Sequence, residues 1–269
     1  MDKKEKLTKE EKKEKRIKTL VYVILRLAVV LVMIAQIFND NWNNVFLCIL
    51  TLILFMIPSF VDRRLHIELP TTLEIIIVVF IFSAEILGEI QEYYLIFDNW
   101  DTILHTTNGF IMAAIGFSLI DILNENENVM LNLSPAFVAI FAFCFSMTIG
   151  VLWEFFEFFM DYFFKTDMQK DTFVPWISSV LLNPQGANVA VTWVIDSVVV
   201  NGQTLPGYID IGLYDTMKDL LVNFIGAVVF SVFGLIYIKN RNSDKPSFAS
   251  RFIPRRKKNN EKDKTQLKE

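Results

Sequence analysis

Long apolar blocks alternate with short polar breaks along most of the chain. A helix needs about 20 mostly apolar residues to cross the roughly 30 Å hydrocarbon core of a bilayer. Six blocks approach or exceed this length, over residues 20–38, 45–60, 73–96, 102–123, 136–159 and 220–238. The pattern predicts an all-α polytopic membrane protein with six transmembrane helices.

Basic residues gather at the two ends of the chain. Residues 1–18 carry nine Lys and Arg against five Asp and Glu, and residues 239–269 carry eleven against four. The span between them carries six against 21. Lys and Arg beside transmembrane helices tend to stay in the cytoplasm. We therefore expect a cytoplasmic N-tail at 1–18, a membrane domain at 19–238 and a cytoplasmic C-tail at 239–269.

The charges of most loops agree with this orientation. Arg63-Arg64 follows the second block and falls inside, whereas the breaks at 39–44 and 92–101 lack Lys and Arg and fall outside. The break at 124–132 also lacks them but falls inside, which does not follow the rule. Six spans with both termini in the cytoplasm fit the charges best.

The charges also indicate partners. The basic tails favour an anionic cytoplasmic lipid surface, and the membrane domain implies contact with membrane lipids. Acidic residues such as Glu10, Glu11 and Glu14 interrupt the positive charge of the first tail. We therefore expect no nucleic acid as a partner.

The connection between the last two blocks, at about 163–214, is the longest one. Val189–Val200 is rich in β-branched residues, Asn201-Gly202 is typical of a tight turn, and residues 205–211 can return as a second strand. The sequence predicts a small extracytoplasmic β-hairpin insertion.

Polar residues in the last three blocks and at their ends are not scattered. At the centre of a span each costs on the order of 2.5–3.5 kcal/mol. They are Asp101, His105 and Asn108; Glu154, Glu157 and Asp161; and Asp215, Asp219 and Asn223. Spacings of three and four residues place each set on one face of its helix. The predicted topology puts all three sets in the outer half of the bilayer, so we expect them to face one another.

This set of side chains suits cation chemistry. Carboxylates with a histidine and an amide favour Mg, Ca, Mn or Zn. The candidate catalytic bases are His105, Glu154 and Glu157. The candidate metal ligands are Asp101, Asp161, Asp215, Asp219 and Asn223. Three other interpretations stay open: helix N-caps at Asp101 and Asp215, carboxylates that share protons, and a structural polar network without a ligand.

Three motifs carry a resemblance to known families. They are Trp100-Asp-Thr-Ile-Leu-His105, Trp153-Glu-Phe-Phe-Glu-Phe-Phe-Met-Asp161, and the run from Tyr214 through Asp215, Asp219 and Asn223 to Gly226. The chain resembles the YjdF-like family of bacterial inner-membrane proteins and, more distantly, VanZ-like proteins, which are linked to glycopeptide-antibiotic resistance. Glu157 stands where VanZ-like proteins usually have Gln. The resemblance implies the bacterial cytoplasmic membrane and brings no settled activity.

Three functions remain open at this point. The first is a cell-envelope protein that handles a lipid headgroup or lipid-linked precursor with a bound cation, as an enzyme or otherwise. The second is a proton- or cation-coupled transporter. The third is a non-catalytic envelope or antibiotic-resistance-associated factor.

Overall fold

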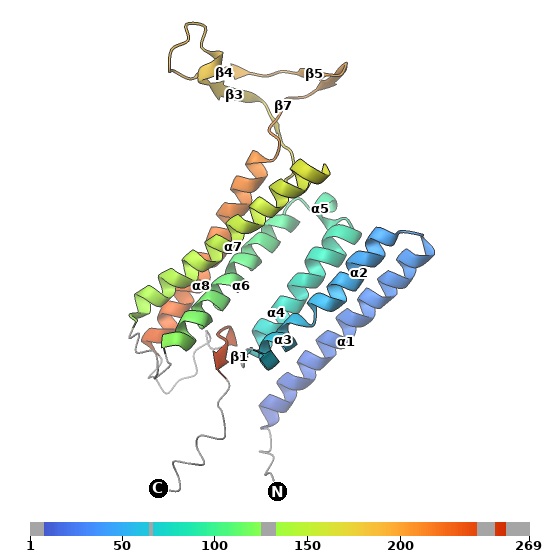
Figure 1. Ribbon diagram of the computed structural model, residues 1–269, viewed down its shortest axis with the longest axis vertical. Coiled ribbons are helices and arrows are strands. Elements are labelled where there is room, and N and C mark those ends of the chain that lie inside the picture. Colours follow the sequence, from blue (N-terminus) through green and yellow to red (C-terminus); the bar gives the residue numbers. More distant parts are fainter. Residues whose placement is uncertain (1–7, 65–66, 125–132, 241–250, 257–269) are drawn as a thin grey trace. The chain divides into compact units, whose positions relative to one another are not determined.

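The computed structural model describes residues 8–64, 67–124, 133–240 and 251–256 (Figure 1). The chain divides into two compact units, residues 1–148 with 222–269, and residues 149–221. Two long helices run through the division without a break, and each unit is described by itself below.

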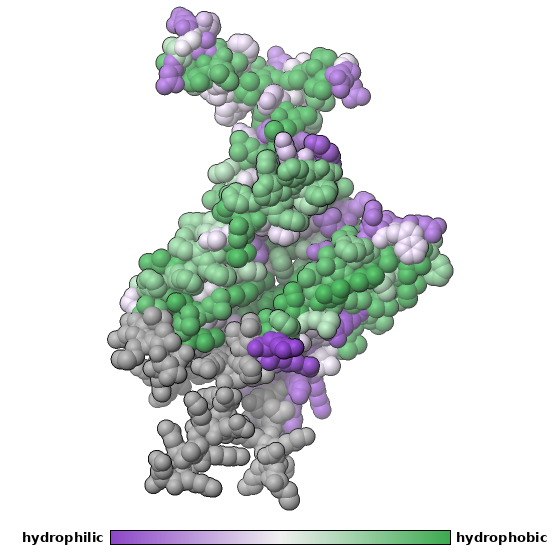
Figure 2. Space-filling view, in the orientation of Figure 1, coloured by the Kyte–Doolittle hydropathy of each residue, from purple (hydrophilic) through white to green (hydrophobic). Residues whose placement is uncertain are grey.

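Helices make up most of the described residues. They are α1 (Lys9–Phe38), α2 (Trp42–Leu54), α3 (Ile57–Arg64), α4 (Thr71–Phe82), the π-helix η1 (Ser83–Ile90), α5 (Tyr93–Ile96), α6 (Trp100–Asn124), α7 (Pro135–Phe164) and α8 (Leu213–Lys239). Five helical segments of the described chain are long and apolar enough to cross a membrane: Lys12–Phe38, Trp42–Arg64, Trp100–Asn124, Pro135–Phe164 and Leu213–Lys239. Their outward surfaces are largely apolar (Figure 2), as contact with lipid requires.

The third expected block differs from the prediction. Residues 73–96 were expected to form one helix, but α4 is followed directly by η1, and the segment is not among the five candidate spans. The hydrogen bond from Gln91 N to Ile86 O, at 3.0 Å, closes a wider π-type turn. Glu92 then takes a left-handed backbone with φ of 57°, and this ends the helix before the short α5.

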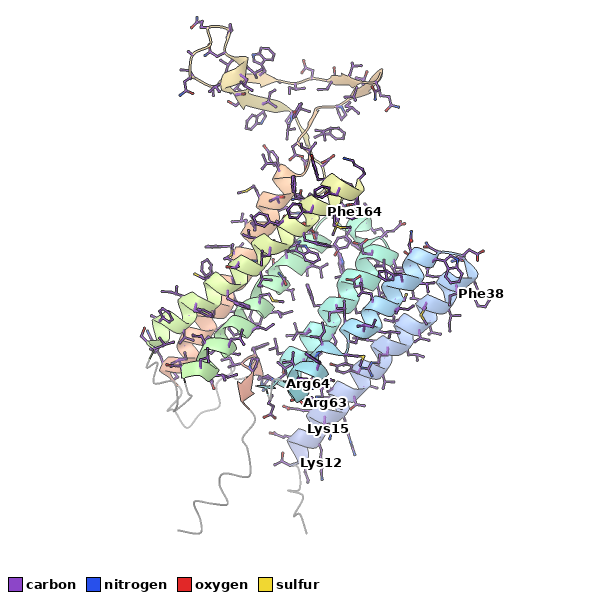
Figure 3. The ribbon with its side chains drawn as sticks, viewed as in Figure 1. Lys12, Lys15, Phe38, Arg63, Arg64 and Phe164 are labelled. Atoms are coloured by element: carbon purple, nitrogen blue, oxygen red, sulfur yellow. The ribbon has the colours of Figure 1, made fainter. Side chains whose placement is uncertain are left out.

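The basic N-terminal segment is partly helical. Helix α1 begins at Lys9, so the second half of the expected 1–18 tail continues directly into the apolar part of the helix. Lys12 and Lys15 lie at the same end of this unit as Arg63 and Arg64, whereas Phe38 lies at the opposite end (Figure 3). The positive charges of α1 and α3 are therefore gathered at one end of the helices.

Two apolar cores hold the first unit together. One joins α1, α2, α4 and η1 through Val29, Cys48, Phe55, Val78, Ile86 and Ile90. The other joins α4, α6, α7 and α8 through Leu73, Ala113, Ala114, Phe117, Val138, Ala142, Ala227 and Phe230. Small side chains such as Ala113, Ala114 and Ala227 let helix backbones approach closely, which is how helices associate in membranes.

A short C-terminal segment folds back onto the first unit. Strand β8 (Arg255–Arg256) pairs antiparallel with β1 (Ile67–Glu68). Ile253 is only 1% exposed, and the Phe252 ring lies 5.4 Å from the Phe110 ring of α6. Part of the expected 239–269 tail therefore packs against the helices.

The second unit contains three two-stranded antiparallel sheets between the end of α7 and the start of α8. They pair β2 (Phe173–Val174) with β7 (Tyr208–Ile209), β3 (Trp176–Ser179) with β4 (Val191–Val194), and β5 (Val198–Val200) with β6 (Gln203–Leu205). The short 3₁₀ helix η2 (Val180–Leu182) follows β3.

The hairpin at Asn201-Gly202 is confirmed. Both turn residues have positive φ, of 51° and 82°, as the turn between β5 and β6 requires. The predicted extent of the strands was wrong. Val189–Val200 is split into β4 and β5, and the return at 205–211 is split into β6 and β7, because β4 and β7 pair with strands earlier in the chain.

Candidate functional site

The first part of the site is the start of helix α6. Asp101 and His105 are one helical turn apart, and Asp101 Oδ1 lies 3.4 Å from His105 Nε2. The Asp101 side chain is 28% exposed and that of His105 is 10% exposed. An (i, i+4) spacing puts both side chains on one face, as the sequence predicted.

Two glycines bring α6 and α8 into backbone contact one turn further along. A Cβ atom on Gly109 would collide with the backbone carbonyl of Asn223, and one on Gly226 would collide with the carbonyl of Thr106. The position of α6 against α8 is therefore defined at two successive contacts. No larger residue fits at either glycine without moving a helix.

Asn223 lies at the centre of this contact and is 1% exposed. Asn108 Nδ2 donates to Asn223 Oδ1 at 3.3 Å, and Asn223 Nδ2 donates to Met147 Sδ at 3.6 Å. Ser146 Oγ donates to the carbonyl oxygen of Gly109 at 2.8 Å. The amide predicted as a metal ligand thus joins α6, α7 and α8 in a polar layer.

Asp219 lies one turn before Asn223 on α8 and is 1% exposed. With Asp101 and His105 it forms a group in which one ligand atom from each residue lies within 4.8 Å of the others. Since α8 is continuous from Leu213 to Lys239, its contacts with Thr106 and Gly109 carry Asp219 to the level of the first turns of α6. Two carboxylates and an imidazole could hold a borderline divalent cation such as Zn or Mn.

Glu154 and Glu157 are placed on α7, and both are buried, at 5% and 8% exposure. Trp153 Nε1 donates to Glu157 Oε1 at 2.8 Å. Neither glutamate belongs to the three-residue group found among the described residues. Their burial supports a structural or chemical role, and the role of catalytic base stays a prediction.

Asp161 and Asp215 accept hydrogen bonds from the backbone of the segment that connects α7 to α8 in the second unit. Asp161 accepts hydrogen bonds from the backbone N–H of Met168 and Gln169, at 2.7 and 2.8 Å. Asp215 accepts one from the backbone N–H of Lys170 at 2.8 Å. These contacts give both carboxylates a loop-bracing role, and their predicted role as metal ligands remains untested.

Asp210 and Asp171 extend this group of carboxylates. Asp210 accepts hydrogen bonds from the backbone N–H of Thr172 and of Tyr214, each at 2.8 Å. Partial burial, followed by the charges of Asp167, Asp210 and Asp161, raises the pKa of Asp171, and Lys170 opposes the shift.

Glu74 is one of the buried polar residues that the sequence did not single out. Glu74 of α4 is 7% exposed and accepts hydrogen bonds from Lys18 Nζ and Tyr22 Oη of α1, each at 2.9 Å. Glu74 is one of four acids in the third expected block, and Lys18 is one of nine basic residues in 1–18, so neither stands out in the sequence. Pairing them required knowledge that α1 and α4 are neighbours.

These observations first define the class of protein. Five long apolar helices with largely apolar outward surfaces identify an integral membrane protein with a partly buried Asp/His/Asp group. The chain belongs to the DUF2238 family, described as a predicted membrane protein, whose model matches residues 19–240. No curated protein and no solved structure gave a match.

Proposed function

We propose that Asp101, His105 and Asp219 bind a divalent cation, and that the bound cation handles a lipid headgroup or lipid-linked precursor of the cell envelope. The observation that carries the proposal is the convergence of three ligand atoms within 4.8 Å. Phosphate-bearing headgroups are hard oxygen ligands, and a cation with an open position would polarise them.

The repulsion between the two carboxylates of this group supports the binding of a cation. Two carboxylates close together in a region of low dielectric repel each other, so protons or a metal must offset part of their charge. Asp219 is almost fully buried, where an uncompensated charge is especially costly. His105 supplies a nitrogen ligand when neutral and a counter-charge when protonated.

The proposed topology has six spans with both termini in the cytoplasm. The span that is added to the five candidate helices is the continuous helical run formed by α4 and η1, over residues 71–90, which corresponds to the third expected block. Arg63 and Arg64 lie at the same end of the unit as Lys12 and Lys15 (Figure 3), in agreement with the positive-inside rule. This orientation places the α7–α8 connection outside a bacterial cytoplasmic membrane, and the resemblance to YjdF-like and VanZ-like proteins supports the same location.

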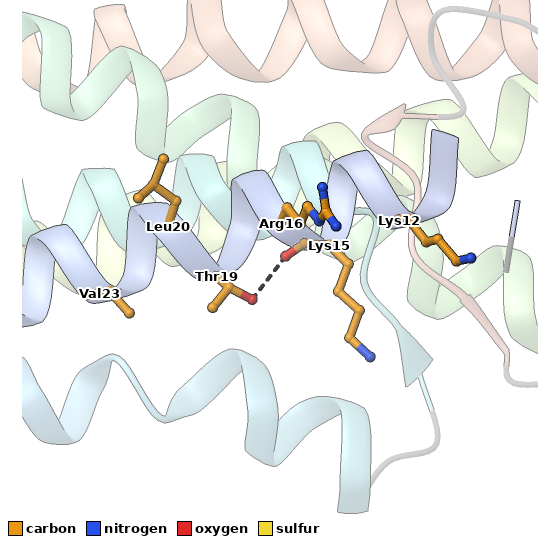
Figure 4. A pocket seen from close by; sticks show the side chains of 6 residues that line it. All are labelled: Lys12, Lys15, Arg16, Thr19, Leu20 and Val23. Atoms are coloured by element: carbon orange, nitrogen blue, oxygen red, sulfur yellow. Dashed lines mark hydrogen bonds between the residues drawn. The ribbon is translucent and has the colours of Figure 1, made fainter. Parts of the chain in front are cut away.

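The basic start of α1 supports contact with anionic lipid. Lys12, Lys15 and Arg16 line a shallow hollow that continues over Thr19, Leu20 and Val23 (Figure 4). Thr19 donates its hydroxyl hydrogen to the carbonyl oxygen of Lys15 at 2.9 Å, so this side chain adds no free donor. Cations beside apolar side chains suit a headgroup and the upper part of its acyl chains.

A proton- or cation-coupled transporter is the second candidate, and buried acids favour it. Glu74 is 7% exposed and Asp121, near the far end of α6, is 6% exposed. Asp121 is 16 residues after His105, or about 24 Å along the helix. Buried polar groups therefore occur at two depths along the helices, as an ion pathway across a membrane requires. A non-catalytic envelope factor is the third alternative.

The test measures metal, lipid and ion flux on one set of variants. Purified wild type is expected to contain a stoichiometric divalent metal, and Asp219→Asn and His105→Ala are expected to lose it. Cell lipid composition should change in these variants if headgroup handling is right, and ion flux in vesicles should change if transport is right. Ser178→Ala, in the β3–β4 sheet, is the matched control. Metal-free wild type would reject the cation site.

Among the proposed bases, Glu157→Gln and Glu154→Gln separate catalysis from binding. If either glutamate is a base, its exchange is expected to abolish turnover while metal content is retained. Loss of metal in both variants would assign them to the cation site instead.

A further inference from the structure

The connection between α7 and α8 has an unusual composition for a segment outside the apolar helices. Residues 173–209 contain one charged residue, Asp196, and no Lys or Arg. Large apolar side chains in this stretch are exposed, most of all Leu181 at 91%, Val194 at 79%, Val199 at 65% and Val189 at 62%. Exposed apolar surface on this scale marks an interaction site.

The sheets cannot bury these side chains themselves. In the β3–β4 pair, Trp176 lies opposite Val194 and Ile177 lies opposite Trp193. Because successive residues point to opposite faces of a strand, each face of this sheet carries one tryptophan and at least one aliphatic residue. In the second unit each strand has one partner only, and the side chains of β3 and β4 alternate between exposed and half-buried or are exposed, with none fully buried.

The β5–β6 pair repeats this arrangement. Val198, Val199 and Val200 are consecutive, so apolar side chains again point to both faces. A strand with apolar residues on both faces is typical of a sheet that is covered on both sides. Here the side chains of Val199 and Val200 remain exposed, at 65% and 47%.

We propose that the β3–β4 and β5–β6 sheets lie in the interfacial layer of the bilayer, beside the lipid headgroups and the parts of the acyl chains nearest to them. Trp176 and Trp193 suit this layer, because indole combines an apolar ring with an N–H donor. The outer edges of the strands keep unpaired backbone groups, which excludes the hydrocarbon core but is tolerated where water and headgroups reach. The near absence of charge matches a neutral lipid surface.

The same features argue against a protein as the occupant. A protein partner covers one face of a two-stranded sheet and usually presents a polar rim with charged side chains. This segment has apolar residues on both faces and a single charge to meet such a rim. Lipid can surround both faces of a two-stranded sheet at once. In addition, the segment is connected at its two ends to the apolar helices α7 and α8, which keep it near a membrane.

The experiment uses nitroxide labels on the full-length chain in vesicles. Cys48 and Cys144 are the native cysteines, so both are first changed to Ala and the fold is checked by thermal melting. Labels are then placed at Val194→Cys and Val199→Cys, with Gln185→Cys in the polar segment between β3 and β4 as the matched control. Vesicles are made of phosphatidylcholine alone or mixed with phosphatidylglycerol.

Accessibility to oxygen, which partitions into lipid, is compared with accessibility to a water-soluble nickel chelate. The oxygen-to-nickel ratio at positions 194 and 199 is expected to exceed that at position 185 several-fold, equally in both lipid mixtures. Ratios equal to that at position 185 would overturn the proposal. Protection from both reagents, or dipolar broadening that disappears on dilution with unlabelled protein, would also overturn it and indicate a protein partner or a second copy.

A second set of variants tests the assignment without labels. The double variant Trp176→Ser with Trp193→Ser keeps Trp42, Trp100 and Trp153, so the fluorescence of the segment is obtained as the difference between wild type and this variant. Brominated lipid is expected to quench that difference, while the melting temperature of the helical part stays unchanged. A difference that brominated lipid leaves unquenched would contradict the role of the two tryptophans.

Discussion

Asn108 donates its side-chain amide to Asn223 at 3.3 Å, directly where Gly109 lets α6 approach the backbone of α8. The hydrogen bond and the close approach depend on each other, because a wider spacing would separate the two amides. This contact fixes how the helices that carry Asp101, His105 and Asp219 meet.

The close approach predicts a large effect of one methyl group. Gly109→Ala is expected to destabilise the protein by about 1–3 kcal/mol, the usual cost of overpacking, because its Cβ meets the carbonyl of Asn223. The melting temperature in detergent measures this. Thr107→Ala, at a half-buried position of α6 two residues before Gly109, is the control and should change little. Equal melting temperatures for both variants would contradict the packing.

The Lys18–Glu74 pair predicts a coupling between α1 and α4. Breaking it with Glu74→Gln or Lys18→Met leaves one charge without its counter-charge, and Lys18 is about one-third exposed, so solvent screens part of the loss. A double-mutant cycle should give a coupling of about 0.5–3 kcal/mol in the free energy of unfolding. Strictly additive single effects would show that the two residues do not interact.

Asp171 predicts a pH effect on the second unit. Its pKa is raised in the folded state, so folding binds its proton more tightly, and stability falls as pH rises through the unfolded and then the folded pKa. Asp171→Asn is therefore expected to raise the melting temperature at neutral pH and to lose this advantage near pH 4, about the ordinary pKa of Asp. Asp196→Asn is the exposed control. A gain independent of pH would contradict the electrostatic cause.

The proposed topology predicts the location of inserted reporters. A reporter at Gln185 is expected outside the cell, and one after Glu269 in the cytoplasm, because basic segments are retained inside. Compartment-specific labelling of single cysteines at the same places provides an independent check. A cytoplasmic Gln185 would reverse the orientation.

Sequence patterns predicted the long spans well because apolar length is a one-dimensional property. The positions of α6, α7 and α8, and the turn at Asn201-Gly202, followed from hydropathy and turn chemistry. The π-helix η1 and the pairing of β4 with β3 did not: η1 differs from an α-helix only in its hydrogen-bond spacing, and β3 and β4 are joined by residues 180–190 rather than by a tight turn. The spacing of Asp101 and His105 was readable from the sequence.

The remaining contacts of the site depended on which helices are adjacent. Asp219 joins Asp101 and His105 because Gly109 and Gly226 bring α6 and α8 together. Asp161 was read as a ligand from its place on a polar stripe, whereas its oxygens accept backbone hydrogen bonds from residues 168 and 169. Helical spacing indicates a shared face but not the partner of that face.

The central claim is the cation held by Asp101, His105 and Asp219, and a melting series in detergent tests it most directly. Wild type is measured with Mg, Ca, Mn, Zn or a chelator, beside Asp219→Asn and the Ser178→Ala control. A bound metal is expected to stabilise wild type by about 2.7 kcal/mol at a hundredfold excess over its dissociation constant. The gain should shrink as pH falls, since protons compete for the ligands, and should be absent in Asp219→Asn. An unchanged melting temperature with every metal, and no metal in the purified protein, would contradict the account and favour carboxylates that share protons.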